Sequence, residues 1–144
     1  MSVTSVHESI VIKSPIDELW AKVKDAQFSW WGIVKSCELE GDSRPLEVGG
    51  TRVVRFKDGT VQKLKLVELS ELEHRLTLEY IESDPPVSFM SALHTIKLNR
   101  VTSDNSTYVE WNAEYSSTDQ AVIEDSRYKR RDGLQDLARA VKED

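Results

Sequence analysis

The fold is decided by residues 48–69, which read VGGTRVVRFKDGTVQKLKLVEL. Two runs of alternating apolar and polar side chains flank Asp58-Gly59, a dipeptide that favours a β-hairpin turn because both residues tolerate positive φ. Successive side chains point to opposite faces of a strand, so Leu64 and Leu66 share one face and the lysines between them share the other. Because lysines stay in water, the leucine face is predicted to point inward.

Arg52 is the most informative residue of this segment. By parity it lies on the apolar face of the first hairpin strand, together with Val54 and Phe56. Burying a guanidinium without a partner costs several kcal/mol. The sequence therefore predicts that Arg52 either pairs inside the protein or lies at the mouth of a wet cavity.

The composition is that of a soluble globular protein. The length of 144 residues favours one domain spanning residues 1–144, with 39% hydrophobic and 31% charged residues. A net charge of -6 argues against a nucleic-acid partner and against an anionic membrane surface. No apolar run approaches the roughly 20 residues that span a bilayer, and no signal-peptide pattern is present. We expect a cytoplasmic protein without stable membrane insertion.

Residues that bind metals or cofactors are sparse. Cys37 is the only cysteine, which excludes an internal disulfide and a cysteine zinc site. His7, His74 and His94 show no metal-ligand spacing, and the chain has no glycine-rich phosphate loop. We therefore expect neither a metal nor a cofactor.

The rest of the chain predicts further strands and helices. Besides the hairpin, alternation predicts strands at residues 6–13, 34–39, 75–82, 89–100 and 107–117. Ser14-Pro15 is predicted to begin a helix, residues 28–32 to form a second helical turn, and residues 119–143 to form a long amphipathic helix. Gly133 costs this helix about 1 kcal/mol relative to alanine, which indicates close packing or a gap. These elements predict an α+β fold in which the long helix covers the dry face of one antiparallel sheet.

Several short motifs occur along the chain in a specific order, although each one alone is weak evidence for a family. They are Ile12-Lys13-Ser14-Pro15 followed by Leu19-Trp20, then Trp30, Val48-Gly49-Gly50-Thr51-Arg52, Asp58-Gly59, Tyr80, Pro85-Pro86 and Val109-Glu110-Trp111. In this order the chain resembles the helix-grip superfamily of the birch pollen allergen and the START lipid-transfer domains. Within it, the chain is most similar to the polyketide cyclase/dehydrase and lipid-transport family. The resemblance implies a seven-stranded antiparallel sheet wrapped around a long C-terminal helix, two short helices between strands 1 and 2, and an apolar cavity.

One departure from this family concerns its chemistry. In the plant abscisic-acid receptors and the onion lachrymatory-factor synthase, an inward glutamate stands where this chain has Leu64. The family arginine is present as Arg52, but its acidic partner is replaced, and proton transfer by that pair lacks its base. The Lys57-Asp58-Gly59 turn is also too tight to be the gate loop of the receptors, which argues against hormone reception of that type.

The resemblance implies a binding or carrier protein for a small hydrophobic molecule, such as a lipid, sterol, polyketide or isoprenoid. Arg52 would orient a polar head. The predicted ligand-binding residues are Arg52, Val54, Phe56, Leu64, Leu66, Tyr80, His94, Trp30, Trp111, Leu134 and Leu137.

Two alternatives remain open, as does the oligomeric state. The first is an enzyme of the cyclase, dehydratase or isomerase kind, with Arg52 as electrostatic stabiliser and His94 or Tyr80 as proton carrier. The second is a protein-interaction module with a filled core and an exposed apolar patch. The basic run Lys129-Arg130-Arg131 is interpreted as a solvated face of the last helix.

Overall fold

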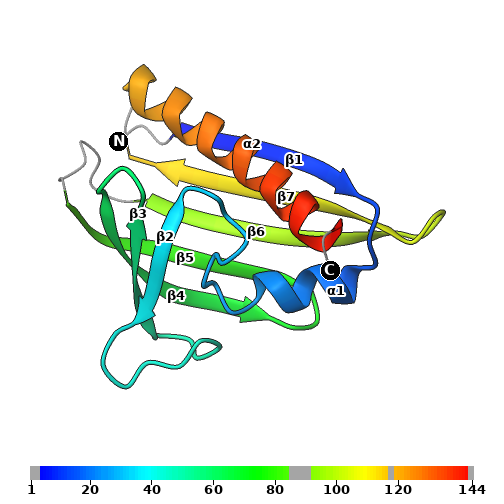
Figure 1. Cartoon of the computed structure of the whole chain (residues 1–144), viewed down its shortest axis with the longest axis horizontal. Coiled ribbons are helices and arrows are strands. Elements are labelled where there is room, and N and C mark those ends of the chain that lie inside the picture. Colours follow the sequence, from blue (N-terminus) through cyan, green and yellow to red (C-terminus); the bar gives the residue numbers. More distant parts are fainter. Residues whose placement is uncertain (1–3, 85–91, 117–118, 143–144) are drawn as a thin grey trace.

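A seven-stranded antiparallel sheet with both helices on one face forms the framework of the protein (Figure 1). The computed structural model describes residues 4–84, 92–116 and 119–142. The strands are β1 Thr4–Ile12, β2 Val34–Leu39, β3 Thr51–Phe56, β4 Val61–Ser70, β5 Arg75–Asp84, β6 Ala92–Val101 and β7 Ser106–Tyr115. The helices are α1 Ile16–Val23 and α2 Gln120–Lys142. The strand order β1-β7-β6-β5-β4-β3-β2 leaves β1 and β2 at the two edges.

The predicted hairpin is confirmed as β3 and β4. Gly59 has φ of 93°, and the Asp58 carboxylate accepts a hydrogen bond from the backbone N–H of Thr60 at 2.9 Å. Only the glycine of the turn takes the left-handed conformation that the dipeptide permits. The register sets Arg52 directly opposite Leu64, so the leucine occupies the position next to the arginine.

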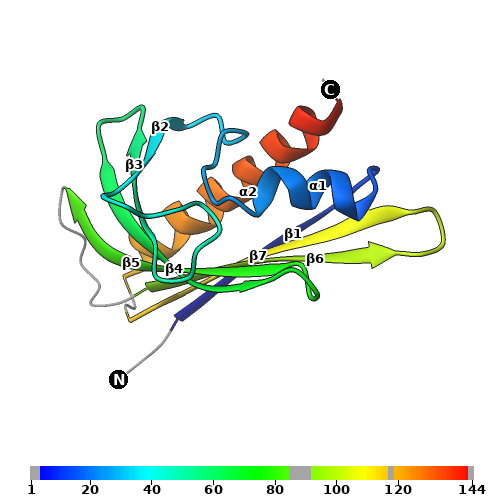
Figure 2. The same cartoon turned by 90° about the horizontal axis from the view of Figure 1, so that it is seen from below.

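The sheet curves around the helices because its strands are interrupted by irregularities. The register shifts twice in β4, between Lys63 and Leu64 and between Leu66 and Glu68, and β2 shifts between Val34 and Ser36. Bulges of this kind bend a strand and increase its twist. In Figure 2 the β2–β3–β4 end of the sheet curls toward the side that carries α1 and α2.

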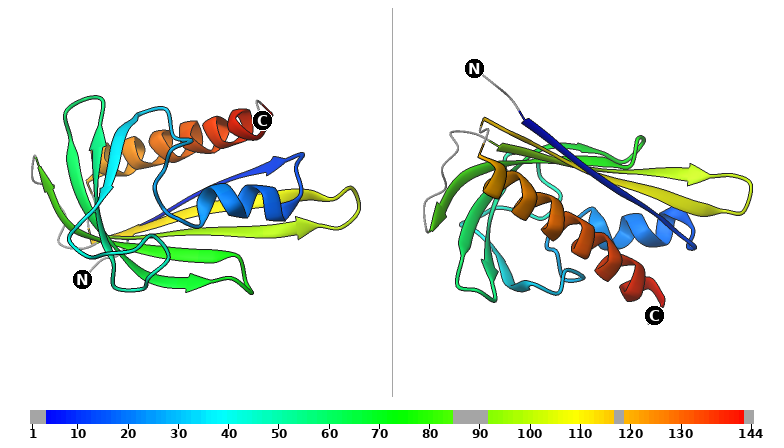
Figure 3. Two further views of the ribbon diagram at one scale, coloured as in Figure 1. Left: turned by 60° about the horizontal axis from the view of Figure 1, so that its bottom comes forward. Right: turned by 90° about the horizontal axis from the view of Figure 1, so that it is seen from above.

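Helix α2 lies across the concave face of the sheet (Figure 3). It confirms the long helix predicted at residues 119–143 to cover this face. Its buried stripe is made of Ile123, Ser126, Arg130, Gly133, Leu134 and Leu137. A Cβ atom on Gly133 would lie 2.7 Å from Cζ3 of Trp111 and 3.0 Å from Nε1 of Trp31. The glycine therefore allows α2 to contact both rings, which confirms the close packing that its cost implied.

Gly133→Ala is expected to destabilise the protein although alanine is the better helix former. Alanine gains about 1 kcal/mol of helix propensity, but overpacking a core costs about 1–3 kcal/mol. We expect a net loss of about 1 kcal/mol in the free energy of unfolding, measured in urea. The control is Gly32→Ala, whose Cβ would have only the carboxylate end of the Asp136 side chain as a close neighbour, with Oδ2 at 2.9 Å. A Gly133→Ala variant as stable as the native protein would contradict this packing.

The predicted second short helix is wrong. Residues 29–33 form successive turns, in which Trp31 N–H donates to the Phe28 carbonyl at 3.0 Å and Val34 N–H donates to the Trp31 carbonyl at 3.0 Å. Ala26 and Phe28 have φ of 52° and 56°, a left-handed conformation that cannot continue a right-handed helix. The predicted start of β6 at residue 89 and the Pro85-Pro86 motif lie outside the described residues.

No helix within the described ranges is long and apolar enough to cross a membrane.

Candidate functional site

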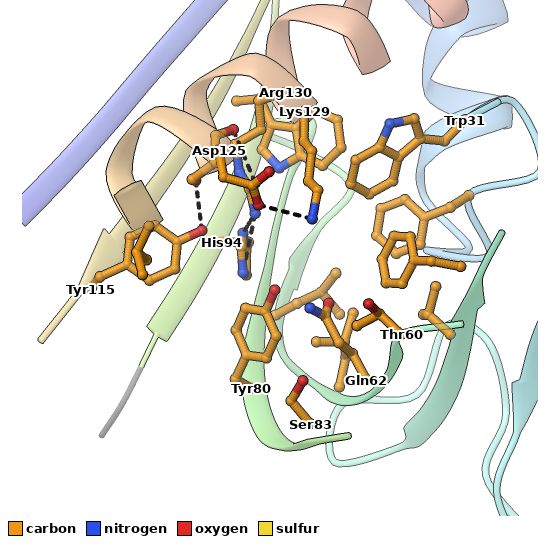
Figure 4. Close-up of a pocket in the computed structure, with 18 residues that line it drawn as sticks. Trp31, Thr60, Gln62, Tyr80, Ser83, His94, Tyr115, Asp125, Lys129 and Arg130 are labelled. Atoms are coloured by element: carbon orange, nitrogen blue, oxygen red, sulfur yellow. Dashed lines mark hydrogen bonds and ion pairs between the residues drawn. The ribbon is translucent and has the colours of Figure 1, made fainter. Parts of the chain in front are cut away.

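A cavity of about 210 Å³ lies between the concave face of the sheet and α2 (Figure 4). Its apolar wall consists of Phe28, Trp31, Val54, Phe56, Leu64, Leu78 and Trp111. Its polar groups come mainly from β4, β5, β6 and α2, and they include Gln62, Tyr80, His94, Ser126 and Arg130. Side chains from strands distant in sequence thus converge with one face of α2 on a single cavity that opens to solvent beside Lys129 and Asp125.

The apolar wall is built on aromatic contacts with Trp111. The Phe28 ring is nearly parallel to the Trp111 ring, with 8° between the planes and 6.2 Å between the centroids. Trp31 meets the same ring edge-on at 4.8 Å. Such offset and edge-on pairs are favoured by the quadrupoles of the rings, and they give this wall a fixed shape.

The structure brings some predicted site residues onto the cavity and leaves others elsewhere. Those on the cavity wall are Val54, Phe56, Leu64, Tyr80, His94 and Trp111. Those in the hydrophobic core but not on the wall are Trp30, Leu66, Leu134 and Leu137. Trp31 and Phe28, from the turns before β2, complete the wall.

Arg52 points away from the cavity, in contrast to its predicted contact with a ligand head. Its side chain is fully buried, and its guanidinium donates to the carbonyls of Asp25 at 2.6 Å, Ala26 at 3.4 Å and Pro45 at 3.3 Å. Burial lowers the pKa of Arg52 from its usual value. The arginine therefore joins two loops, and its partners are backbone carbonyls in place of the missing glutamate.

Arg130 takes the place on the cavity wall that the sequence suggested for Arg52. Its exposure is 4%, so the interpretation of the 129–131 run as a solvated face is wrong for this residue. Its guanidinium donates to the Ser126 carbonyl at 3.3 Å, contacts the His94 ring and lies 5.3 Å from the centre of the Trp111 ring. The sequence signal was helical phase, because Arg130 follows Ser126 by four residues and precedes Leu134 by four.

His94 lies on the same wall between Tyr80 and Arg130. Its ring is 4.7 Å from the Tyr80 ring, and Arg130 lies within hydrogen-bond distance of both ring nitrogens. Burial, reinforced by the Arg130 charge, lowers the pKa of His94 well below its usual value. Burial also raises the pKa of the Tyr80 phenol. Both groups are therefore neutral at pH 7.

The buried, neutral His94 is expected to make stability depend on pH. An unfolded histidine binds a proton near pH 6.5, whereas His94 in the folded protein does so only at a lower pH. Between these pH values the unfolded state carries more protons, so stability falls as pH falls below about 6.5. The loss approaches about 1.4 kcal/mol per pH unit.

Urea unfolding between pH 5 and 8 measures this effect. His94→Gln should remove this part of the slope, whereas His7→Gln, at an exposed position, serves as the matched control. An unchanged slope in His94→Gln would show that the histidine is not held neutral.

Few other groups among the described residues could bind a metal or catalyse a reaction. Within the described part of the chain, no group of three or more His, Cys, Asp or Glu residues could hold a metal ion. The described residues of the cavity wall offer instead one buried cation, one neutral imidazole and hydroxyl groups beside aromatic rings. Such a site can bind an amphiphilic molecule or exchange a proton with it.

Comparisons with known proteins agree with this geometry. The family model described as "Polyketide cyclase / dehydrase and lipid transport" matches residues 3–142. No curated protein matches. A solved structure from Nitrosospira multiformis is 29% identical, with a TM-score of 0.84 and coverage of 94% of each chain.

Two further solved structures share the fold at lower identity. Ginseng major latex-like protein 151 from Panax ginseng is 17% identical with a TM-score of 0.77, over 96% of this chain and 97% of that one. Ara h 8.0201 is 12% identical with a TM-score of 0.80, over 99% of this chain and 100% of that one.

Proposed function

Because the chain belongs to the polyketide cyclase/dehydrase and lipid transport family, we propose that it binds a small, mostly apolar molecule in the cavity between the sheet and α2. The observation that carries this proposal is the cavity itself, enclosed by aromatic and aliphatic side chains with a few polar groups along one side. Pre-formed sites with this division of apolar and polar groups are typical of small-molecule binding.

The volume of the cavity limits the size of the molecule. An engineered cavity of about 150 Å³ holds benzene, so about 210 Å³ suits a molecule on the order of ten non-hydrogen atoms. A substituted ring or a short branched chain meets this limit. A sterol or long fatty acid, among the ligand classes that the family resemblance implies, would extend beyond this volume through the open side of the cavity.

Thermal unfolding with small apolar probes tests the proposal. Toluene and indole should raise the Tm of the native protein in a concentration-dependent manner, because a ligand that binds only the folded state stabilises it. Thr60→Trp places bulk on the cavity wall and should abolish the shift. Thr95→Trp, on the outer face of β6, is the matched control and should keep it. Equal shifts in both variants, or none in the native protein, would count against ligand binding in this cavity.

A second candidate function is acid–base catalysis of the cyclase or dehydratase kind, favoured by the neutral His94 beside Arg130. His94 would remove a proton from the carbon next to a carbonyl, and the electron pair would move to the carbonyl oxygen, which Arg130 would stabilise. Proton exchange on 1-indanone in D₂O, followed by NMR, tests this step. Exchange above the buffer rate that disappears in His94→Gln supports it, and exchange at the buffer rate opposes it.

A further inference from the structure

Arg130 is a buried cation on the cavity wall that has no carboxylate partner among the described residues. Its hydrogen-bond partners among the described residues are the Ser126 carbonyl and the His94 ring, neither of which is an anion. Its Nε atom is buried and has no hydrogen-bond partner in the described part of the chain. Burying a guanidinium without an opposite charge is costly, and natural proteins usually pair such groups.

The other titratable groups on the wall do not compensate this charge. Lys129 and Asp125 form an ion pair at 2.9 Å with side chains 30% and 60% exposed, so they neutralise each other where the cavity meets solvent (Figure 4). Tyr80 stays neutral because burial raises the pKa of its phenol. His94 is neutral because burial lowers its pKa. The cavity wall therefore carries one uncompensated positive charge.

Some buried N–H groups of wall residues also lack an acceptor. The indole Nε1 of Trp111, a residue of the cavity wall, is buried and has no partner within the described ranges. Nε1 of Trp31 is also buried without a partner, but it lies against Gly133 of α2. Nε1 of Trp111 and Nε of Arg130 are thus two buried N–H groups of wall residues that lack an acceptor among the described residues. Because buried polar groups are nearly always paired, such a site suits a ligand rich in acceptor oxygens.

We propose that the molecule bound in the cavity is a small carboxylate, whose anionic group pairs with Arg130 while its ring or short chain packs on the aromatic wall. A carboxylate presents two acceptor oxygens to the planar donors of a guanidinium, and the pair is strengthened where water is excluded. This inference rests on the proposed function, which it narrows from small apolar molecules to small apolar acids. The size limit of the cavity points to acids built on one ring or a short chain.

Matched pairs of acids and amides test the inference. The probes are benzoate, phenylacetate and 3-phenylpropanoate, each compared by isothermal titration calorimetry at pH 7.5 with the amide of the same shape. We expect the acid of the pair that fits to bind at least tenfold more tightly than its amide. Arg130→Met should remove this preference and leave amide binding in place.

Arg131→Met is the matched control because Arg131 is the next residue on α2. Its side chain is 61% exposed and pairs with Glu8 at 3.0 Å, away from the cavity wall. Arg131→Met should keep the preference for the acid. Arg130→Lys, which retains the positive charge, provides a second variant if the methionine variant does not fold, and it should keep a reduced preference.

The outcomes separate this inference from the proposed function. Equal affinities of acid and amide in the native protein would overturn the carboxylate inference but leave binding of a small apolar molecule intact. A preference that survives in Arg130→Met would overturn the role of Arg130. Failure of every acid and every amide to bind would overturn both.

Discussion

Replacing Arg52 with methionine is expected to lower the free energy of unfolding by about 2–4 kcal/mol, because the guanidinium donates three charge-assisted hydrogen bonds to buried or half-buried carbonyls. Removing the unpaired charge returns part of this loss. The rest of the loss in stability arises because the segment before β2 no longer has these hydrogen bonds. In this segment Ala26 and Phe28 both hold a left-handed backbone. Such residues cost on the order of 1–3 kcal/mol each and persist only when their surroundings hold them in place.

Urea unfolding and probe binding together measure the role of Arg52. Arg55→Met, three residues further along β3 and on its exposed face, is the matched control and should change stability little. Arg52→Lys should restore little, since an ammonium lacks the planar donors that reach both loops. A fully stable Arg52→Met protein that has lost ligand binding would instead support the contact with a ligand head that the sequence predicted.

Replacing Trp111 with alanine is expected to cost about 3–5 kcal/mol, the range for removing a large aromatic side chain from a core. Trp111 is 1% exposed, and its ring contacts Phe28, Trp30 and Trp31. It also contacts α2 at Gly133, so the space left by the ring would adjoin the existing cavity. The variant should therefore be less stable than the native protein and should bind larger molecules.

Chemical denaturation and a titration with biphenyl, which exceeds the native size limit, test both expectations. The matched control is Trp20→Ala, which removes another buried tryptophan whose indole N–H donates to Glu71 at 2.9 Å and which does not line the cavity. That variant should lose stability without gaining biphenyl binding. Biphenyl binding by both variants would show that loosening of the core, not the vacated volume, admits the larger molecule.

The sheet and the long helix could be predicted because their signals are periodic. Alternation in the hairpin and in β7 identified the inward faces, and parity alone placed Leu64, His94 and Trp111 on the side where the cavity lies. The change to helical spacing after residue 119 identified α2. Periodic burial of this kind depends on each strand or helix alone, so sequence suffices to find it.

The surroundings of Arg52 and Arg130 could not be predicted from periodicity. Parity correctly buried Arg52, but its partners are carbonyls of a turn whose left-handed residues are Ala26 and Phe28, without a glycine to signal them. Arg130 was hidden within a run of basic residues, although its phase matched that of Leu134 and Leu137. Which of two inward arginines faces the cavity depends on the packing of loops against the sheet, and no local pattern contains that information.

The open order of the sheet has a consequence for the behaviour of the protein at high concentration. Edge strands expose unpaired backbone groups that can recruit strands of other chains into aggregates. Here β2 is only 6 residues long, is interrupted between Val34 and Ser36 and carries the charge of Lys35, all features that discourage such recruitment. At the other edge, the ion pair of Glu8 with Arg131 fastens β1 to the helix beside it. Both edges of the sheet therefore carry features that oppose its growth beyond its own chain.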